Sequence, residues 1–259
     1  MNWLGYLGLL LALPTLLSAE TYHPHDYKSG FAIIQALGRD IYNSLPPAER
    51  SQLGPNPISI DSSRKPLVRL LYFKEGNQII RGVWVSQGFV DLVNHLAHAK
   101  AIDQIRRGYL ARYVQMLENA GDAIPPLPER DNPDFWTDNL LNEQLSNFNS
   151  IVGIVVGIQL AQHYLGLYEK YEHHFKNYET AALPLNALLA REEWEQSYRR
   201  GLASAMQAGC MTEGFLPVCE ALDKMKKRPA WVACFFPDNI PFKAMRKDMA
   251  RLQYKFLNN

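Results

Sequence analysis

Apolar residues recur at helical spacing along much of the chain. In "FAIIQALGRDIYNSL" the residues Phe31, Ile34, Leu37, Ile41 and Leu45 fall on one face, and the pattern stops at a Pro-Pro pair, which predicts a first helix. Similar spacing predicts helices in "FVDLVNHLAHAKAIDQI", "GYLARYVQMLENAG", "REEWEQSYRRGLASAMQAG", "GFLPVCEALDKM" and "PFKAMRKDMARLQYKFL".

The longest apolar stretch predicts a helix from about residue 142 to 175. Its first half, "FNSIVGIVVGIQLA", approaches the length of a membrane span. However, Gln159, Gln162 and His163 interrupt the apolar run. These polar residues favour the buried core helix of a globular domain over a membrane span.

Two shorter runs have the composition of β-strands. "PLVRLLYF" (66–73) and "QIIRGVWVS" (78–86) flank the turn "KEGN" and predict a hairpin, whereas "SQLGPNPISIDSS" before them is predicted to be loop. Residues 122–140 are rich in Pro and Asp and predict an ordered surface loop anchored by aromatic side chains. The order of helix, hairpin and several helices predicts an α+β fold in which a small sheet covers a helical core.

Composition and charge narrow the class of protein only a little. The 259 residues are 47% hydrophobic and 20% charged, which predicts one sizeable globular domain over 20–259 with the 122–140 loop inserted in it. The formal net charge is +1 and no Lys/Arg stripe is present, so the sequence gives no argument for a nucleic-acid partner.

The first nineteen residues predict export. "MNWLGYLGLLLALPTLLSA" holds no charged side chain, and its apolar run is shorter than the about 20 residues of a membrane span. We therefore expect a signal peptide over 1–19, cleaved after Ala19, and a periplasmic or extracellular protein. An uncleaved anchor is the alternative, and only then would the membrane be a partner.

Export bears on the cysteines, of which the chain has three. An oxidising compartment permits one disulfide and leaves one thiol over. Cys210 and Cys219 flank a predicted turn, "CMTEGFLPVC", and are the candidate pair. The alternative is that they are free and buried, since an unpaired Cys behaves as a small hydrophobic residue.

The segment "IVVGIQLAQHYLG" resembles a catalytic helix in length and spacing but lacks the zinc ligands and the general base. With His, Glu and His at the positions of Ile158, Gln159 and Gln162 it would become the H-E-x-x-H helix of a zinc peptidase. In such a helix two imidazoles four positions apart bind one zinc ion, and the Glu between them activates the zinc-bound water.

The order of segments resembles the gluzincin family of zinc metallopeptidases that includes the HtpX-type membrane protease and the BepA-type chaperone protease. The resemblance covers about 58–252. "VWVSQGFVDLVN" is similar to the edge strand and following helix of the family, "IVVGIQLAQHY" to its active-site helix, and "REEWEQSYRRGLASAMQAGC" to its later ligand-bearing helix. "WVACFFPDN" resembles its closing Thr-His-Pro segment, with Phe236 at the His position. The resemblance implies a zincin-like fold.

The zinc site that the resemblance implies is degenerate at every ligand. Ile158 has no lone pair, and the Gln159 amide cannot act as a general base near neutral pH. The Gln162 amide is a poor zinc ligand beside imidazole. In the later helix, Trp194 stands at the position of the third ligand and Tyr198 at that of an Asp. We therefore expect no catalytic residue, no bound metal and no cofactor.

A rearranged zinc site is the alternative. His163 could combine with Glu193 or Glu195, which a shift of one residue would bring to the ligand position, or His95 and His98 could share a helix face. The chain would then be an active zinc-dependent endopeptidase. The competing interpretation is structural, because His163 lies one position beyond the motif and should point away from it.

The function expected for a degenerate enzyme is binding of a peptide or protein partner. An edge strand pairs with an extended peptide through main-chain hydrogen bonds, which need no zinc. The candidate binding residues come from the predicted edge strand and from two aromatic side chains in the loop. They are Val83, Trp84, Val85, Ser86, Phe135 and Trp136, of which Trp84 is the third aromatic residue. The alternative for the aromatic side chains is packing of the loop onto the domain. A third possibility is a resemblance of architecture alone, with an unrelated role.

Overall fold

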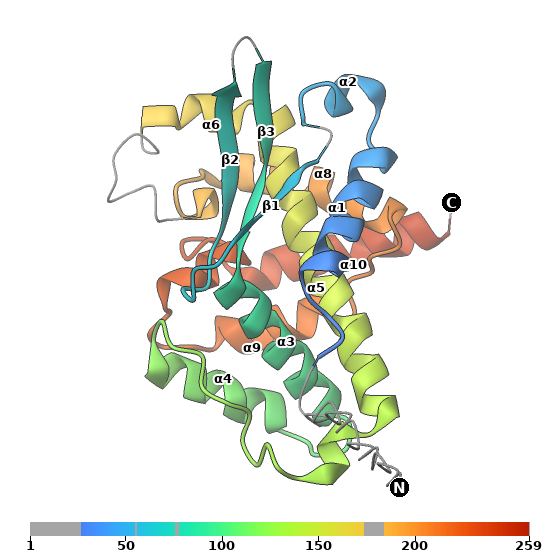
Figure 1. Cartoon of the computed structure of the whole chain (residues 1–259), viewed down its shortest axis with the longest axis vertical. Coiled ribbons are helices and arrows are strands. Elements are labelled where there is room, and N and C mark those ends of the chain that lie inside the picture. The colour runs from blue at the N-terminus through green and yellow to red at the C-terminus, as the bar shows by residue number, and fades with distance from the viewer. Residues whose placement is uncertain (1–26, 55, 76–77, 174–183, 259) are drawn as a thin grey trace, which may run out of the picture.

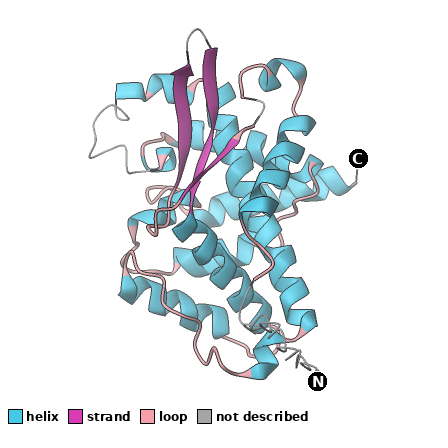
Figure 2. Cartoon of the chain, viewed as in Figure 1, coloured by secondary structure: helices cyan, strands magenta, loops and turns pink. Residues whose placement is uncertain are grey.

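The computed structural model describes residues 27–54, 56–75, 78–173 and 184–258. The predicted signal segment, 1–19, lies outside the described residues. Over the rest, the chain is an α+β protein, mostly helical with one small sheet. Figure 2 shows the three strands at one end of the molecule, among helices that make up most of its mass.

The sheet contains the predicted hairpin and one further strand. The hairpin is β2 (Val68–Glu75) and β3 (Gln78–Ser86), paired antiparallel with Val68 opposite Val85. The further strand is β1 (Ile58–Asp61), which pairs parallel with β3. The strand order is β1-β3-β2. The prediction of loop for 51–63 was therefore wrong over these four residues, because their extended form depends on pairing with β3.

The predicted helices are present with small changes at their ends. They surround the longest helix, α5, in Figure 1. The helices are α1 (Phe31–Ser44), α2 (Pro47–Arg50), α3 (Gln87–Ile102), α4 (Tyr109–Ala120), η1 (Pro133–Trp136), α5 (Asp138–Tyr164), α6 (Leu167–Lys170), η2 (Leu185–Ala187), α8 (Arg191–Gln207), α9 (Phe215–Asp223), η3 (Ala230–Cys234) and α10 (Phe242–Leu257).

α5 is the centre of the core. It packs on α3 and α8 most extensively and also on α1, β2 and β3. Two glycines bring α5 and α8 together: a Cβ on Gly157 would lie 2.5 Å from the carbonyl oxygen of Gly201, and one on Gly201 would lie 2.4 Å from the backbone of Ile158. α5 is apolar and long enough to cross a membrane, but 83% of its most apolar window is buried inside the protein. This burial agrees with the predicted core helix.

The helix predicted over 142–175 is broken in the structure. α5 ends at Tyr164 and the short α6 begins at Leu167. Gly166 between them has a φ of +70°, a left-handed conformation that ends helices and that favours glycine. The break turns α6 onto the sheet, where Tyr168 stacks on Tyr72 with ring centroids 4.4 Å apart.

The predicted disulfide is absent. Cys210, Cys219 and Cys234 are all free and buried. Cys210 packs against α5, where its Sγ would lie 2.2 Å from a Cβ on Gly153. Cys219 lies in α9 and faces the core. Since each thiol is used in packing, both cysteines act as small apolar residues.

Candidate functional site

The three positions of the motif on α5 are fully enclosed. Ile158, Gln159 and Gln162 are each no more than 1% exposed. The Nε2 atoms of Gln159 and Gln162 donate to the same acceptor, Oδ1 of Asn186, over 3.3 and 2.6 Å. Asn186 lies in η2 and is itself fully buried.

Asn186 also connects α5 to the closing segment of the resemblance. Its Nδ2 donates to the carbonyl oxygens of Ala233 at 2.8 Å and Cys234 at 3.4 Å, both in η3. Phe236, which follows η3, is buried against Phe242 with ring centroids 5.2 Å apart. We call Gln159, Gln162 and Asn186 with the two accepting carbonyls the amide network.

The later helix supplies no ligand toward α5. Trp194 is fully buried, and Tyr198 donates from its hydroxyl to Oδ2 of Asp248 in α10 at 2.9 Å. Glu193 accepts from the backbone N–H of Ala190 at 2.9 Å at the start of α8 and from the hydroxyl of Tyr171. Glu195 pairs with arginines of its own helix, Arg191 at 3.0 Å and Arg199 at 3.4 Å.

His163 points away from the motif, as its place one residue further on predicted. Its Nε2 donates to the carbonyl oxygen of Gly82 in β3 at 2.7 Å. Burial lowers the pKa of His163 to about 4, against the opposing effect of this hydrogen bond, so the imidazole is neutral near pH 7. His163 therefore connects α5 to β3 of the sheet through this hydrogen bond.

These residues do not fit a zinc ion. The side chains at the ligand positions are a branched alkyl group, amides and an indole, and the amide of Asn186 fills the space that they enclose. Across the described residues, no three His, Cys, Asp or Glu side chains come close enough to hold a metal. The Oε1 atoms of Gln159 and Gln162 are buried without a hydrogen-bond partner among the described residues.

The predicted binding strand is not at an edge. β3 is the central strand, so Val83 and Val85 pair with β1 on one side and β2 on the other, while Ser86 pairs with Asp61 of β1. Val83 and Val85 are fully buried. Trp84 is half-buried, with the guanidinium of Arg69 3.9 Å from its ring centroid. The prediction of a peptide-binding rim at 83–86 was wrong, because the edge strand expected from the resemblance is covered by β1 in this chain.

Ser86 instead organises the junction of sheet and α3. Its Oγ donates to the carbonyl oxygen of Lys65 at 2.7 Å and accepts from the N–H groups of Leu67 at 2.9 Å and Phe89 at 3.0 Å. The last of these bonds is an N-cap of α3. The serine thus joins the β1–β2 connection to the first turn of α3.

The loop predicted over 122–140 is shorter in the structure, because η1 covers Pro133–Trp136 and α5 already begins at Asp138. Its aromatic anchors pack over α3 and α4, as predicted. Phe135 is buried, and its carbonyl oxygen accepts from Nε2 of His98 at 2.6 Å. Because Nε2 of His98 carries the proton, its Nδ1 accepts from the hydroxyl of Tyr27 at 3.1 Å. Burial lowers the pKa of His98 to about 4, which keeps the imidazole neutral.

His95 has a separate set of partners. Its Nδ1 lies 2.9 Å from the hydroxyl of Tyr113, and this hydroxyl donates to the carbonyl oxygen of Pro125 at 2.9 Å. Nδ1 of His95 therefore carries the proton and Nε2 is an acceptor. Burial lowers the pKa of His95 to about 4, and the charges of His98 and Arg130 lower it further. The two histidines thus bind loop and tyrosine groups and form no shared metal site.

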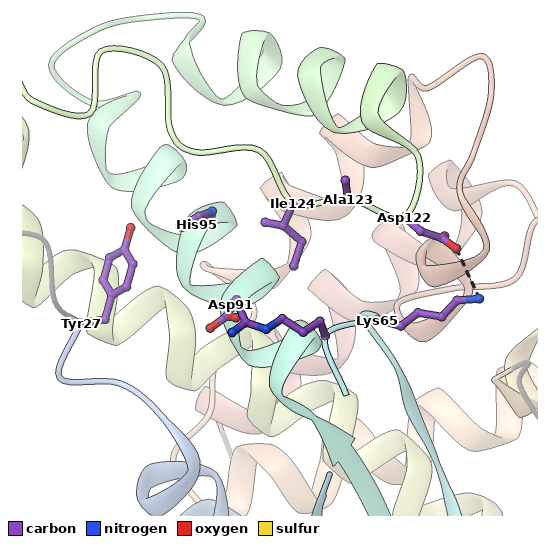
Figure 3. Close-up of a pocket in the computed structure, with 8 residues that line it drawn as sticks. Tyr27, Lys65, Asp91, His95, Asp122, Ala123 and Ile124 are labelled. Carbon is purple, nitrogen blue, oxygen red and sulfur yellow. Dashed lines mark ion pairs between the residues drawn. The ribbon is translucent and has the colours of Figure 1, made fainter. Parts of the chain in front are cut away.

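A cleft of about 710 Å³ opens beside His95 on α3. Figure 3 shows Tyr27 at one end and the Lys65–Asp122 ion pair at the other, with Asp91, His95 and Ile124 between them. A smaller hollow shares Tyr27 and His95 and reaches Trp136. We call the two together the α3 cleft. Its lining residues are Tyr27, Arg64, Lys65, Asp91, His95, Asp122, Ala123, Ile124, Leu127, Arg130 and Trp136.

A scan against protein-family models, a search of curated proteins and a search of solved structures each found no match to this chain.

Two parts of these sites carried no signal in the sequence. Asn186 stands in a short apolar stretch, "LPLNALLA", that belongs to no motif. Tyr27, Arg64 and Arg130 come from three separate loops and meet only in the fold. Of the predicted binding residues, only Trp136 lines the α3 cleft.

Proposed function

We propose that the chain is an exported, catalytically inactive protein of metallopeptidase-like design that binds a peptide or protein partner. The observation that supports this proposal is the amide network, in which Oδ1 of Asn186 accepts from both Gln159 and Gln162. Under the resemblance, Gln159 and Gln162 occupy the positions of the general base and of one imidazole of a zinc peptidase. A carboxylate, an imidazole and a water could not fit there without displacing Asn186.

The strand and helix order adds support for the zincin-like part of the proposal. A sheet that contains the hairpin is followed by a helix that begins at Gln87, then by α5 and by α8 crossing it at Gly157 and Gly201. The small mixed sheet and helical core agree with the α+β class that the resemblance implies. Binding by strand addition at 83–86 is not part of the proposal, since both sides of β3 are paired.

Metal analysis of the purified full chain tests the proposal. We expect no stoichiometric zinc after growth in zinc-supplemented medium and no chelator-sensitive cleavage of an unfolded protein substrate. One tightly bound zinc ion per chain would support the alternative, an active endopeptidase with rearranged ligands.

Restoring the ligands gives a second test. The quadruple variant Ile158→His, Gln159→Glu, Gln162→His and Trp194→Glu supplies two imidazoles, a base and a third carboxylate. With Asn186→Gly added to clear the space, we expect zinc to raise the melting temperature, since a ligand that binds only the folded state stabilises it. The matched control keeps Gln162 and Trp194 and should show no such zinc dependence. A fully substituted variant that folds but is indifferent to zinc would count against the resemblance.

A further inference from the structure

The α3 cleft has the size and the fixed walls of a ligand site. Its larger hollow, of about 710 Å³, falls within the roughly 300–1,000 Å³ typical of such sites. The β1–β2 connection is held against α3 by Ser86 and by the N–H of Gly88, which donates to the carbonyl oxygen of Ser63 at 2.9 Å. A Cβ on Gly88 would lie 2.1 Å from the carbonyl oxygen of Arg64, so glycine is needed for this close approach.

Two arginines in the cleft have no counter-ion. Arg64 and Arg130 are exposed, and neither side chain forms an ion pair or a hydrogen bond with any described residue. Lys65 differs, because it pairs with Asp122 at 3.3 Å. A guanidinium group presents paired N–H donors that match the two oxygens of a carboxylate. The arginines are therefore suited to a carboxylate ligand.

The α3 wall between the arginines offers acceptors. Asp91 and His95 lie one turn apart on α3 and both line the cleft. Asp91 accepts from Nε2 of Gln87 at 2.8 Å through one oxygen, which leaves its second oxygen available. Nε2 of His95 is an acceptor because Nδ1 holds the proton that faces Tyr113. Such acceptors suit main-chain N–H groups of a ligand.

The charge and the apolar surface of the cleft restrict the class of ligand further. The two unpaired arginines and Asp91 give a local charge of +1, since Lys65 and Asp122 cancel. This balance matches the single negative charge of a carboxylate better than the roughly −1.5 to −2 of a phosphate group. Ile124, Leu127 and the rings of Tyr27 and Trp136 provide apolar contacts along the same cleft.

We propose that the α3 cleft binds a carboxylate-bearing peptide, with Arg64 and Arg130 donating to the carboxylate and Asp91 and His95 accepting from peptide N–H groups. The proposal rests on the partner-binding function above and gives it a location and a ligand chemistry. It places binding away from the amide network, on a side of α3 that no residue of the motif reaches.

Three short peptides test the proposal on the full chain. The probes are acetyl-Ala-Leu-Phe with a free carboxylate, acetyl-Ala-Leu-Phe-amide, and acetyl-Ala-Asp-Phe-amide, which moves the carboxylate to a side chain. NMR titration follows the imidazole signals of His95 and the indole N–H of Trp136. We expect saturable shifts with one or both acidic probes and at least tenfold weaker binding of the neutral amide. The stronger acidic probe identifies the carboxylate as terminal or as a side chain.

Variants then connect binding to the two arginines. Arg64→Gln and Arg130→Gln should each weaken binding of the acidic probe about tenfold or more, the loss expected for a charged hydrogen bond of about 1.5–3 kcal/mol. The matched control is Arg39→Gln, which removes an exposed arginine of α1 that lines neither hollow. Because all three arginines are exposed, we expect the variants to fold, which circular dichroism checks.

Three results would overturn the proposal: no shift at millimolar peptide, equal binding of acidic and neutral probes, or acidic binding that survives loss of both arginines. The zinc measurements on the same preparation are independent of these results. A chain without zinc that binds none of the probes would refute the ligand class and leave the inactive-enzyme proposal standing. A chain that contains zinc and binds the acidic probes would refute the inactive-enzyme proposal and leave the ligand class standing.

Discussion

Nε2 of Gln162 donates to Oδ1 of Asn186 over 2.6 Å, deep in the core and 24 residues apart in the sequence. This bond connects the end of α5 to η2, and through Nδ2 of Asn186 to η3. The side chain of Asn186 therefore holds α5, η2 and η3 together, although these segments are separated in the sequence. A buried amide that satisfies donors and acceptors in this manner specifies one arrangement of the segments around it.

Loss of this side chain should destabilise the protein strongly. Asn186→Ala leaves the N–H groups of Gln159 and Gln162 and the carbonyl of Ala233 without their partner. Each buried unsatisfied group costs about 1–3 kcal/mol, so we expect a loss of about 3 kcal/mol in the free energy of unfolding, measured by urea denaturation. The control Asn258→Ala removes an exposed amide at the end of α10 and should change it by less than about 0.5 kcal/mol. A small effect at both positions would mean that the network contributes little.

The contact between Gly157 and Gly201 predicts an unusual response to alanine. In an exposed helix, Gly→Ala stabilises by about 1 kcal/mol. In α8, Gly201→Ala should lower the free energy of unfolding by at least about 2 kcal/mol, since the added Cβ would lie 2.4 Å from the backbone of Ile158. Gly30→Ala is the control, because a Cβ there meets nothing within 4 Å. If thermal denaturation ranked the two variants equally, the close packing of α5 and α8 would be wrong.

The buried histidines predict loss of stability in mild acid. His95, His98 and His163 each have a pKa lowered by burial to about 4, against about 6.5 in an unfolded chain. Between these values the unfolded chain binds protons that the folded chain does not. The contribution of the buried neutral histidines to the free energy of unfolding is therefore complete above about pH 6.5. It declines toward pH 4 by about 1.4 kcal/mol per pH unit for each histidine.

A variant at His98 checks the size of this effect. His98→Gln keeps a donor for the carbonyl of Phe135 and removes one titrating group. The slope of unfolding free energy against pH between 6.5 and 4 should fall by about 1.4 kcal/mol per pH unit. An unaltered slope in His98→Gln would show that this imidazole is charged in the folded protein.

The cysteines should be unreactive in the folded chain and fully reduced after unfolding. Burial raises the pKa of Cys210 to about 11 and that of Cys234 to about 12, and it raises the pKa of Cys219 well above its usual value. Thiolate is the reactive form, so Ellman's reagent should react slowly with the native protein. All three thiols should react in denaturant without reductant. A single reactive thiol there would indicate that Cys210 and Cys219 do pair in solution.

Local patterns in the sequence predicted which helices and strands form better than they predicted which of these elements lie side by side. The helix at 31–44 and the hairpin follow from spacing that depends on nearby residues only. β1 was missed because "ISID", between Pro57 and Ser62, has too few residues to show a period. The edge position of β3 was taken from the resemblance, and pairing with the missed strand contradicts it. The break at Gly166 was also missed, since one glycine within a helical pattern does not always end a helix.

The site was predicted in part. The sequence showed that the zinc ligands are replaced at Ile158, Gln159 and Gln162, and the structure closes the space between them with buried side chains and with hydrogen bonds to Asn186. The residue that fills it, Asn186, could not be found, because no spacing rule relates it to α5. The arginines of the α3 cleft were missed for the same reason, since each lies alone in a loop.

The central position of α5 has a consequence for how the protein meets other molecules. This helix contacts α1, β3 and α3 from the first third of the described chain and α8 and α9 from its last third. α3 and α8 each make their most extensive contacts with α5, so withdrawal of α5 would expose much of the hydrophobic core at once. Recognition must then take place on a body of nearly constant shape, with an association rate set by diffusion and orientation.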